Sequence, residues 1–191
     1  MSRIFLDVGS NIGQTIELIL RPRFRIDHIV GFEPSPICYN ILERKFKKHS
    51  KVTIVRAGLW SETCEMNLYN EGSVGGTVHS DYQTTCAPEP RITKCKFIKA
   101  SDWFKDSVCK DDEVFLKLNC EGSECRIITD LIDSGEYGKI KAVLVDFDVR
   151  KSPTARPQEN ELRERLKTEG INNLHIYAGD HRHMLLPSIL R

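Results

Sequence analysis

The sequence has no excess of charge of either sign. Its 191 residues include 28 Lys and Arg against 27 Asp and Glu, which gives a formal net charge of +1. The protein therefore has no global electrostatic attraction for nucleic acid or for an anionic membrane. Two local runs of basic residues are expected to be solvated helix and loop faces, the alternative being a patch that meets an anionic partner. The runs are Arg21, Arg23 and Arg25, and then Arg44, Lys45, Lys47, Lys48 and Lys51.

Long hydrophobic runs are also missing. No apolar stretch approaches the roughly 20 residues that a membrane-spanning helix needs. Residues 1–7 hold too short an apolar stretch for a secretory signal and lead directly into an expected strand, so we expect the sequence to start where a domain starts. We expect a cytoplasmic protein without a membrane span, and nothing in the sequence predicts its oligomeric state.

Cysteine pairs with the spacing of a zinc site are absent, although cysteine itself is common. The seven cysteines form no C-x-x-C pair and no cluster with histidine, so no metal site is predicted. We expect mostly buried, reduced thiols, with a disulfide between Cys86 and Cys95 as the alternative. The seven are Cys38, Cys64, Cys86, Cys95, Cys109, Cys120 and Cys125.

The sequence does contain a regular alternation of apolar runs with helical patterns. In its first third, strands are expected at 4–8, 28–33 and 52–55, and helices at 12–20 and from 34 to about 49. Nearly continuous apolar strands joined by helices predict a parallel sheet that is covered on both faces.

The middle of the chain has a different composition. Residues 59–98 are rich in Gly, Ser, Thr and Pro and hold short strand-like pieces, so we expect a variable insertion with hairpin-like strands. The alternation then returns without a linker, and residues 1–191 are expected to form one domain. The expected elements of this part are strands at 65–69, 96–98, 114–118, 142–147 and 174–177, helices at 123–134 and 159–169, and a connecting loop at 150–158.

A glycine-bearing turn, Asp-Val-Gly-Ser-Asn-Ile-Gly at residues 7–13, follows the first expected strand. Gly9 permits a tight turn, Gly13 permits close packing of a helix on a strand, and Asn11 tolerates a left-handed backbone. Ligands of open α/β sheets bind beyond the carboxyl ends of the strands, and free amides at a helix start suit a carboxylate. The turn predicts a ligand site, although a G-x-x-x-G turn alone is not specific.

An acidic turn follows the second expected strand. Glu33 ends that strand, 20 residues after Gly13, in the segment Phe-Glu-Pro-Ser-Pro. A carboxylate at this place can accept hydrogen bonds from both hydroxyls of a ribose, the alternative being a carboxylate that stabilises the start of the next helix. The first turn lacks the G-x-G-x-x-G pattern for a pyrophosphate, so the two turns favour a smaller nucleoside cofactor with an amino-acid end.

Three motifs in this order resemble the FkbM family of class I methyltransferases. The family has a D-V-G-A-N-x-G turn, an F-E-P turn and a K-I-D-x-E-G-x-E segment, which match residues 7–13, 32–34 and 117–124. The resemblance covers about residues 3 to 149. It implies a Rossmann-like three-layer α/β sandwich, with a mostly parallel sheet and an antiparallel C-terminal strand. It also implies the cofactor S-adenosylmethionine and O-methylation of hydroxyls on sugars or natural products.

The resemblance further implies the residues that hold this cofactor. The glycine turn would surround its methionine end, Asp7 would lie near its ammonium group, Glu33 would hold the ribose, and residues 57–59 would lie beside the adenine. The implied cofactor-binding residues are Asp7, Gly9, Ser10, Asn11, Gly13, Glu33, Pro34, Ser35, Ala57, Gly58, Leu59 and Asn119.

Catalytic residues are expected at the ends of the later strands. Glu121 is the first candidate for a general base, with Asp146 and then His79 behind it. Glu121 could instead cap the next helix, and His79 could be a surface residue. Asp146 and Asp148 point the same way on a strand, but we expect solvated carboxylates there rather than a metal site. The family's aspartate is Asn119 here, and an amide can form hydrogen bonds but cannot act as a base.

The sequence therefore predicts an S-adenosylmethionine-dependent methyltransferase that acts by O-methylation on a hydroxyl of a sugar or small molecule. Its expected partner is a small-molecule or glycan acceptor, and a nucleic-acid partner is not expected. Two alternatives stay open. One is a non-catalytic cofactor-binding module with the same fold, which Asn119 favours, and the other is a nucleic-acid methyltransferase that uses the basic runs.

Overall fold

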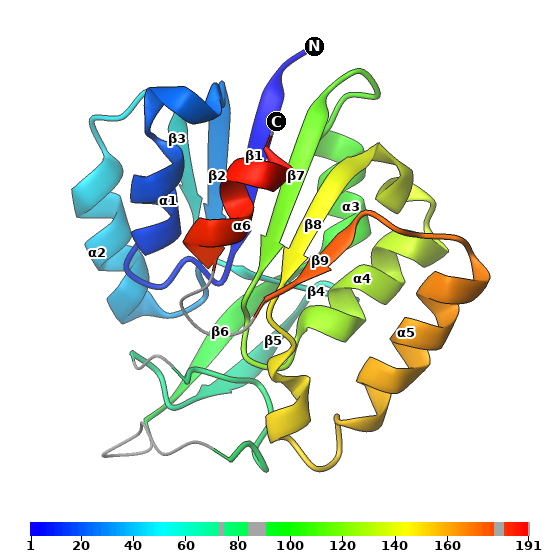
Figure 1. Ribbon diagram of the computed structural model, residues 1–191. Coiled ribbons are helices and arrows are strands. Elements are labelled where there is room, and N and C mark those ends of the chain that lie inside the picture. Colours follow the sequence, from blue (N-terminus) through cyan, green and yellow to red (C-terminus); the bar gives the residue numbers. More distant parts are fainter. Residues whose placement is uncertain (73–74, 84–90, 178–181, 191) are drawn as a thin grey trace.

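Six parallel strands form the central sheet of the computed structural model, which describes residues 1–72, 75–83, 91–177 and 182–190 (Figure 1). The strands are β1 (Arg3–Val8), β2 (His28–Phe32), β3 (Val52–Val55), β7 (Glu113–Leu118), β8 (Ile140–Val145) and β9 (Leu174–Ile176). Their order is β3-β2-β1-β7-β8-β9, and each neighbouring pair is parallel. The central strands β1 and β7 are buried along nearly their whole length, as expected for apolar strands covered on both faces.

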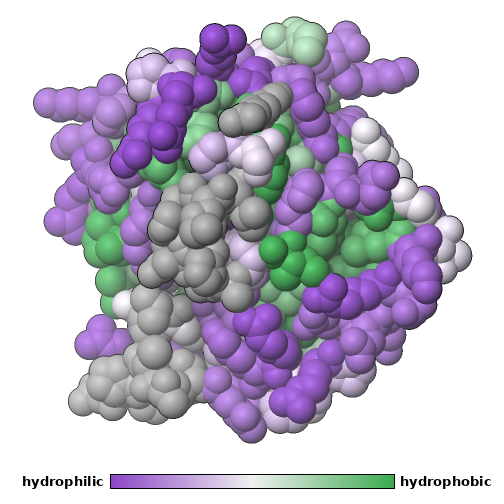
Figure 2. Space-filling model, in the orientation of Figure 1, coloured by the Kyte–Doolittle hydropathy of each residue, from purple (hydrophilic) through white to green (hydrophobic). Residues whose placement is uncertain are grey.

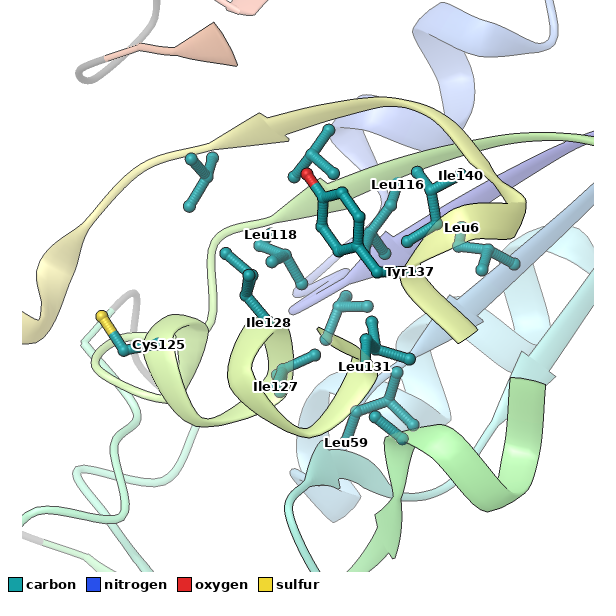
Figure 3. Close-up of a cluster of buried hydrophobic side chains, with 14 of the residues drawn as sticks. Leu6, Leu59, Leu116, Leu118, Cys125, Ile127, Ile128, Leu131, Tyr137 and Ile140 are labelled. Atoms are coloured by element: carbon teal, nitrogen blue, oxygen red, sulfur yellow. The ribbon is translucent and has the colours of Figure 1, made fainter. Parts of the chain in front are cut away.

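Helices cover both faces of this sheet. One face carries α1 (Gln14–Ile19), α2 (Pro36–Phe46) and α6 (Arg182–Ile189), and the other carries α3 (Ala100–Ser107), α4 (Glu124–Asp133) and α5 (Pro157–Thr168). Successive residues of β1 point to opposite faces, so Phe5 belongs to the first core and Leu6 to the second. Figure 3 shows the second core, where Leu6 and Leu116 of the sheet face Ile127 and Leu131 of α4. The predicted three-layer, Rossmann-like α/β sandwich is confirmed, and no helix of the described ranges is long and apolar enough to cross a membrane.

The last strand runs in the direction opposite to the one expected. An antiparallel C-terminal strand was expected, and this is wrong, because β9 pairs in parallel with β8 and places Ile176 opposite Val145. The physical reason is the connection between them. Helix α5 carries the chain back along the sheet, and a strand that follows such a helical crossover runs parallel to the strand before it.

The insertion builds a second, smaller sheet near the carboxyl edge of the first (Figure 1). Its strands are β4 (Gly58–Trp60), β5 (Cys64–Tyr69) and β6 (Ile92–Lys99), in the order β4-β6-β5. β5 and β6 pair antiparallel, which confirms the expected hairpin-like strands, whereas β4 and β6 are parallel. Trp60, Leu68, Cys95 and Phe97 form a small core of their own in this sheet.

Among the α-helices and strands, three were not predicted from the sequence. β4 has three residues, too few to show an alternation, and α3 follows β6 directly at Ala100 without a turn signal. α6 contains Pro187, a residue that normally argues against a helix interior. The expected loop at 150–158 instead holds the end of a 3-10 helix, η3 (Asp148–Lys151), and the start of α5.

The described cysteines are free thiols, as expected for most of them. Burial raises the pKa of Cys38 and of Cys95 to about 11, so both thiols stay protonated at neutral pH. Cys86, the possible disulfide partner of Cys95, lies outside the described residues.

Candidate functional site

A cavity of about 390 Å³ opens at the carboxyl edge of the central sheet, around the point between β1 and β7 where the strand order reverses. Ligands of open α/β sheets bind at this place, and the volume suits a small molecule. The predicted site residues that line it are Gly9, Ser10, Asn11, Glu33, Pro34, Ser35, Gly58, Leu59, Asn119, Glu121 and Asp146. Three others, Asp7, Gly13 and Ala57, do not line it.

The turn after β1 depends on a glycine with no room for a side chain. Gly9 has a φ of 76°, and a Cβ atom there would lie 1.9 Å from the backbone oxygen of Asn119. The amides of Gly9 and Ser10 both donate to the backbone oxygen of Phe32, each at 3.1 Å. Asn11 has a φ of 50°, the left-handed conformation that its side chain tolerates. The turn is thereby fixed to the ends of both neighbouring strands.

Gly13 has a different structural role from the one expected. Its φ is 88°, and a Cβ atom would lie 2.5 Å from Cε2 of Phe46 in α2. Gly13 therefore permits close packing of two helices, and the expectation of helix against strand is wrong. Because Asn11 and Gly13 are both left-handed, α1 begins at Gln14 and not at Ile12.

A buried ion pair lies beneath this turn. Lys117 is 1% exposed, and its Nζ atom lies 2.8 Å from Oδ1 of Asp7. The same ammonium donates to the backbone oxygens of Gly9 at 3.0 Å and Val8 at 3.4 Å. The structure thus directs the carboxylate of Asp7 towards Lys117, while Lys117 itself lines the cavity.

Glu33 directly follows β2 and lines the cavity, and each of its carboxylate oxygens accepts a hydrogen bond from a backbone amide. Its Oε2 atom accepts from the amide of Asn11 at 2.8 Å, and its Oε1 atom from the amide of Ser35 at 2.9 Å. Burial raises the pKa of Glu33 to about 7, although these two amides and the charge of Lys117 act in the opposite direction. We call the part of the cavity formed by residues 9–11 and Glu33 the glycine-turn end.

The turn after β7 is stabilised by another buried carboxylate, which accepts hydrogen bonds from backbone amides of the turn. Glu124 is 0% exposed and accepts from the amides of Cys120 at 3.0 Å and Gly122 at 3.1 Å. Glu121 and Gly122 are both left-handed, with φ values of 52° and 108°. Asn119 lines the cavity beside them, and its buried Oδ1 atom has no hydrogen-bond partner among the residues that the structure describes.

Glu121 sits in a cluster of charged groups, which we call the Glu121 end of the cavity. Its Oε2 atom accepts a hydrogen bond from the hydroxyl of Tyr82 and lies 3.4 Å from Nζ of Lys151. Lys151 also lies 2.8 Å from Oδ1 of Asp148. Burial and the charge of Asp148 raise the pKa of Glu121 to about 7, against the lowering by Tyr82 and Lys151. A carboxylate with such a pKa can accept a proton near neutral pH.

The other candidate catalytic residues lie nearby. Asp146 lines the cavity, and its Oδ1 atom lies 3.3 Å from Arg150. His79 does not line the cavity, and its Nε2 atom lies 3.0 Å from the backbone oxygen of Gly122. Within residues 1–72, 75–83, 91–177 and 182–190, no three His, Cys, Asp or Glu side chains come together as a metal site would require.

Several residues of the site were missed from the sequence. Lys117 had a readable signal, because a lysine inside an apolar strand needs a buried partner. Tyr82 and Lys151 had none, since only the fold brings them to Glu121. Glu71 was missed in the same way: its Oε1 atom accepts from the hydroxyl of Ser35 at 2.5 Å, beside the start of α2.

The strand order, its reversal at β1 and β7 and the cavity at that reversal define a Rossmann-like α/β protein. The chain is similar to the crystal structure of methyltransferase FkbM from Methylobacillus flagellatus KT, with a TM-score of 0.50 and 16% sequence identity. The match covers 85% of this chain and 37% of that chain, so this chain spans little more than a third of the other's length. The likeness shows that the chain has the fold of an FkbM methyltransferase. No family model matches the sequence, and no curated protein matches it.

Proposed function

We propose that the cavity binds S-adenosylmethionine and that the protein transfers its methyl group to a hydroxyl of a sugar or another small molecule. The observation that carries this proposal is the buried Oδ1 atom of Asn119, which has no donor among the described residues and belongs to a residue that lines the same cavity as Glu33. A buried acceptor without a donor costs about 1–3 kcal/mol. The ammonium group at the amino-acid end of the cofactor would be such a donor.

Other parts of the cavity suit the rest of this cofactor. Each oxygen of Glu33 accepts one backbone amide, and a carboxylate oxygen has a further lone pair for a ribose hydroxyl. Leu59, Leu68 and Phe97 supply apolar lining, which suits an adenine ring. The residues present therefore fit a nucleoside with an amino-acid end.

Glu121 is the residue that we assign to proton removal. When bound, the cofactor would supply an electrophilic methyl group on a sulfonium. In such a transfer the acceptor oxygen would bond to the methyl carbon as the sulfur–carbon bond breaks, and the proton of the acceptor hydroxyl would have to leave. Glu121 lines the cavity and would take that proton, while Tyr82 and Lys151 hold its carboxylate in place.

A nucleic-acid acceptor gains no support from the basic runs. Residues 21–25 precede β2, and residues 47–51, the later part of the second run, precede β3, so these residues lie at the amino edge of the sheet. The cavity lies at the carboxyl edge, about 16 Å away along a five-residue strand. The runs are therefore on the wrong side to guide a nucleic acid into the cavity.

A non-catalytic cofactor-binding module is the second candidate, and one observation favours it. The best-placed carboxylate, Glu121, is already bound to Tyr82 and Lys151, and Asn119 cannot act as a base. Tritiated-methyl transfer from S-adenosylmethionine to sugar, RNA and protein pools separates the two functions. Transfer to the sugar pool supports the enzyme, and binding without transfer to any pool supports the module.

Calorimetry with S-adenosylmethionine and with S-adenosylhomocysteine tests the cofactor assignment. The unaltered protein should bind both, and Glu33→Ala should weaken binding by about tenfold to a hundredfold, because two charge-assisted hydrogen bonds are lost. Glu43→Ala, an exposed glutamate of α2, is the matched control and should leave the affinity unchanged. No heat at millimolar ligand would sink the proposal, and an unchanged affinity of Glu33→Ala would remove the ribose assignment.

A further inference from the structure

The two basic runs do not line the cavity, but the fold brings them together at the amino edge of the sheet. The strands that follow them, β2 and β3, are neighbours in the sheet. Lys51 Nζ donates to the backbone oxygen of Ile26 at 2.9 Å, and the backbone oxygen of Lys51 accepts from the amide of Ile29 at 2.7 Å. Residues 21–25 and 47–51 therefore form one continuous surface at the amino edge, which we call the basic edge.

The basic edge carries charges that the described protein does not neutralise. Its six cationic side chains are exposed, and none of them forms an ion pair with a carboxylate within the described ranges. They are Arg21, Arg23, Arg25, Lys47, Lys48 and Lys51. Residues 110–113, which lead into β7, are in contrast one lysine and three acids, so the exposed positive excess is greatest before β2 and β3. This local excess of positive charge does not appear in the net charge of +1, because acidic residues elsewhere in the chain offset it.

A second cavity, of about 600 Å³, adjoins the basic edge. Its charged lining consists of Arg3, Arg23, Arg25 and Lys141 against the single carboxylate of Glu113. The guanidinium of Arg3 is held by the backbone oxygens of Phe24 at 2.8 Å and Leu190 at 2.7 Å. Figure 2 shows hydrophilic residues along the upper edge of the molecule, where β1 begins in Figure 1. Concave shape and positive charge together favour an anionic ligand over bare solvent.

The side chains around these cations indicate which kind of anion fits. Phe24 and Phe46 are each 3% exposed and offer no surface on which bases could stack, and the exposed ring within 47–51 is that of His49. A membrane-binding surface adds exposed apolar side chains to its cations, and none of the large exposed hydrophobic residues lies in 21–25 or 47–51. The surface therefore offers cationic side chains without large exposed hydrophobic ones, which favours the phosphate backbone of a nucleic acid.

We propose that the basic edge binds the phosphate backbone of a nucleic acid without reading its base sequence. This interaction is separate from the proposed methyl transfer, because the two surfaces lie at opposite edges of the sheet. Nucleic acid is a binding partner in this proposal, and the methyl acceptor remains a small molecule. Binding at the basic edge leaves the first cavity open to its own ligand.

Fluorescence anisotropy with a labelled single-stranded RNA of mixed sequence tests the proposal. The unaltered protein should bind at about 50 mM salt, and the logarithm of the affinity should fall against the logarithm of salt with a slope of about −4 for six cations. The triple variant Arg21→Glu, Arg23→Glu, Lys48→Glu should lose about tenfold or more in affinity. A second RNA of different sequence should bind within about twofold of the first.

The matched control changes the same number of charges elsewhere. The triple variant Lys96→Glu, Lys105→Glu, Lys167→Glu alters exposed lysines of β6, α3 and α5 and should keep the RNA affinity within about twofold. Both triples should retain the circular dichroism of the unaltered protein. An equal loss in the control, no binding of RNA at about 50 mM salt, or capture by phosphatidylserine vesicles but not by RNA would each overturn the proposal.

Discussion

The two ends of the cavity are built in different ways. At the glycine-turn end, backbone amides and carbonyls supply the shape: Gly9 and Ser10 donate to Phe32, and Asn11 donates to Glu33. At the Glu121 end, side chains from separate segments supply it, because Tyr82 comes from the insertion and Lys151 from the end of η3.

This difference predicts which amino-acid substitutions each end of the cavity tolerates. A backbone-built turn fails when a side chain is added, since neither the turn nor the strand beside it can move far. A side-chain cluster loses one contact at a time, and its remaining partners still hold the carboxylate. We therefore expect large effects from substitutions at the first end and graded effects at the second.

Gly9→Ala should have the largest effect of all. The new Cβ atom would lie 1.9 Å from the backbone oxygen of Asn119 at a φ of 76°, so we expect about 3 kcal/mol or more of lost stability and no cofactor binding. Gly135→Ala is the matched control, because Gly135 has a φ of 80° with nothing within 4 Å, and it should cost about 1 kcal/mol. Urea unfolding measures both, and equal losses would show that the close approach to Asn119 has no importance.

Glu124→Ala should come next, because it removes the support of the turn that carries Asn119 and Glu121. The amides of Cys120 and Gly122 would lose their buried acceptor, at a cost of about 2–3 kcal/mol in the free energy of unfolding. Glu124→Gln keeps one acceptor oxygen and should cost less than about 1 kcal/mol. Urea unfolding compares the two variants, and a glutamine variant as unstable as the alanine one would contradict this role.

Stability should also depend on pH through three buried carboxyls. The pKa values of Glu33, Glu121 and Glu124 rise from 4.5 to about 7 on folding, chiefly by burial. The folded protein then binds protons that the unfolded chain has lost, so this stability is present below pH 4.5 and is lost as the pH rises through about 7. The urea midpoint should fall between pH 5.5 and pH 8, less steeply for Glu124→Gln.

The same carboxyls should separate the two ends when ligand binding is measured. The affinity for S-adenosylhomocysteine should increase as the pH rises through about 7, because Glu33 accepts ribose hydroxyls best when it is ionised. Glu121→Gln should leave that rise in place, and Glu33→Gln should remove it. A rise that disappears in Glu121→Gln would mean that the two ends titrate together.

Tyr82→Phe should have the smallest effect. It removes one hydrogen bond to Glu121 while Lys151 remains, so we expect a loss of about 1 kcal/mol in stability and an affinity for S-adenosylhomocysteine within about twofold. Because that hydrogen bond lowers the pKa of Glu121, the pH optimum of any methyl transfer should shift upwards. A loss of cofactor affinity as large as that of Glu33→Ala would break the distinction between the ends.

The sequence by itself determined the sheet, its order of turns and the glycine-turn end. Residues 7–13 and Glu33 could be placed because each turn directly follows an apolar strand, and parallel strands bring such turns to one edge. The direction of β9 and the bounds of α6 could not be read in this way, since crossover geometry and tertiary packing decide them.

Three features could be seen only in the tertiary structure: the side chains that surround Glu121, the pairing of Asp7 with Lys117, and the joining of the two basic runs in the basic edge. Tyr82, Glu121 and Lys151 lie far apart in the chain, and their meeting depends on how the insertion folds back over β7 and β8. Lys117 meets Asp7 because β1 and β7 are neighbours, although more than a hundred residues separate them. Local sequence patterns indicate which residues are buried and which residues form turns. Side chains from distant segments come together only when the helices and strands pack.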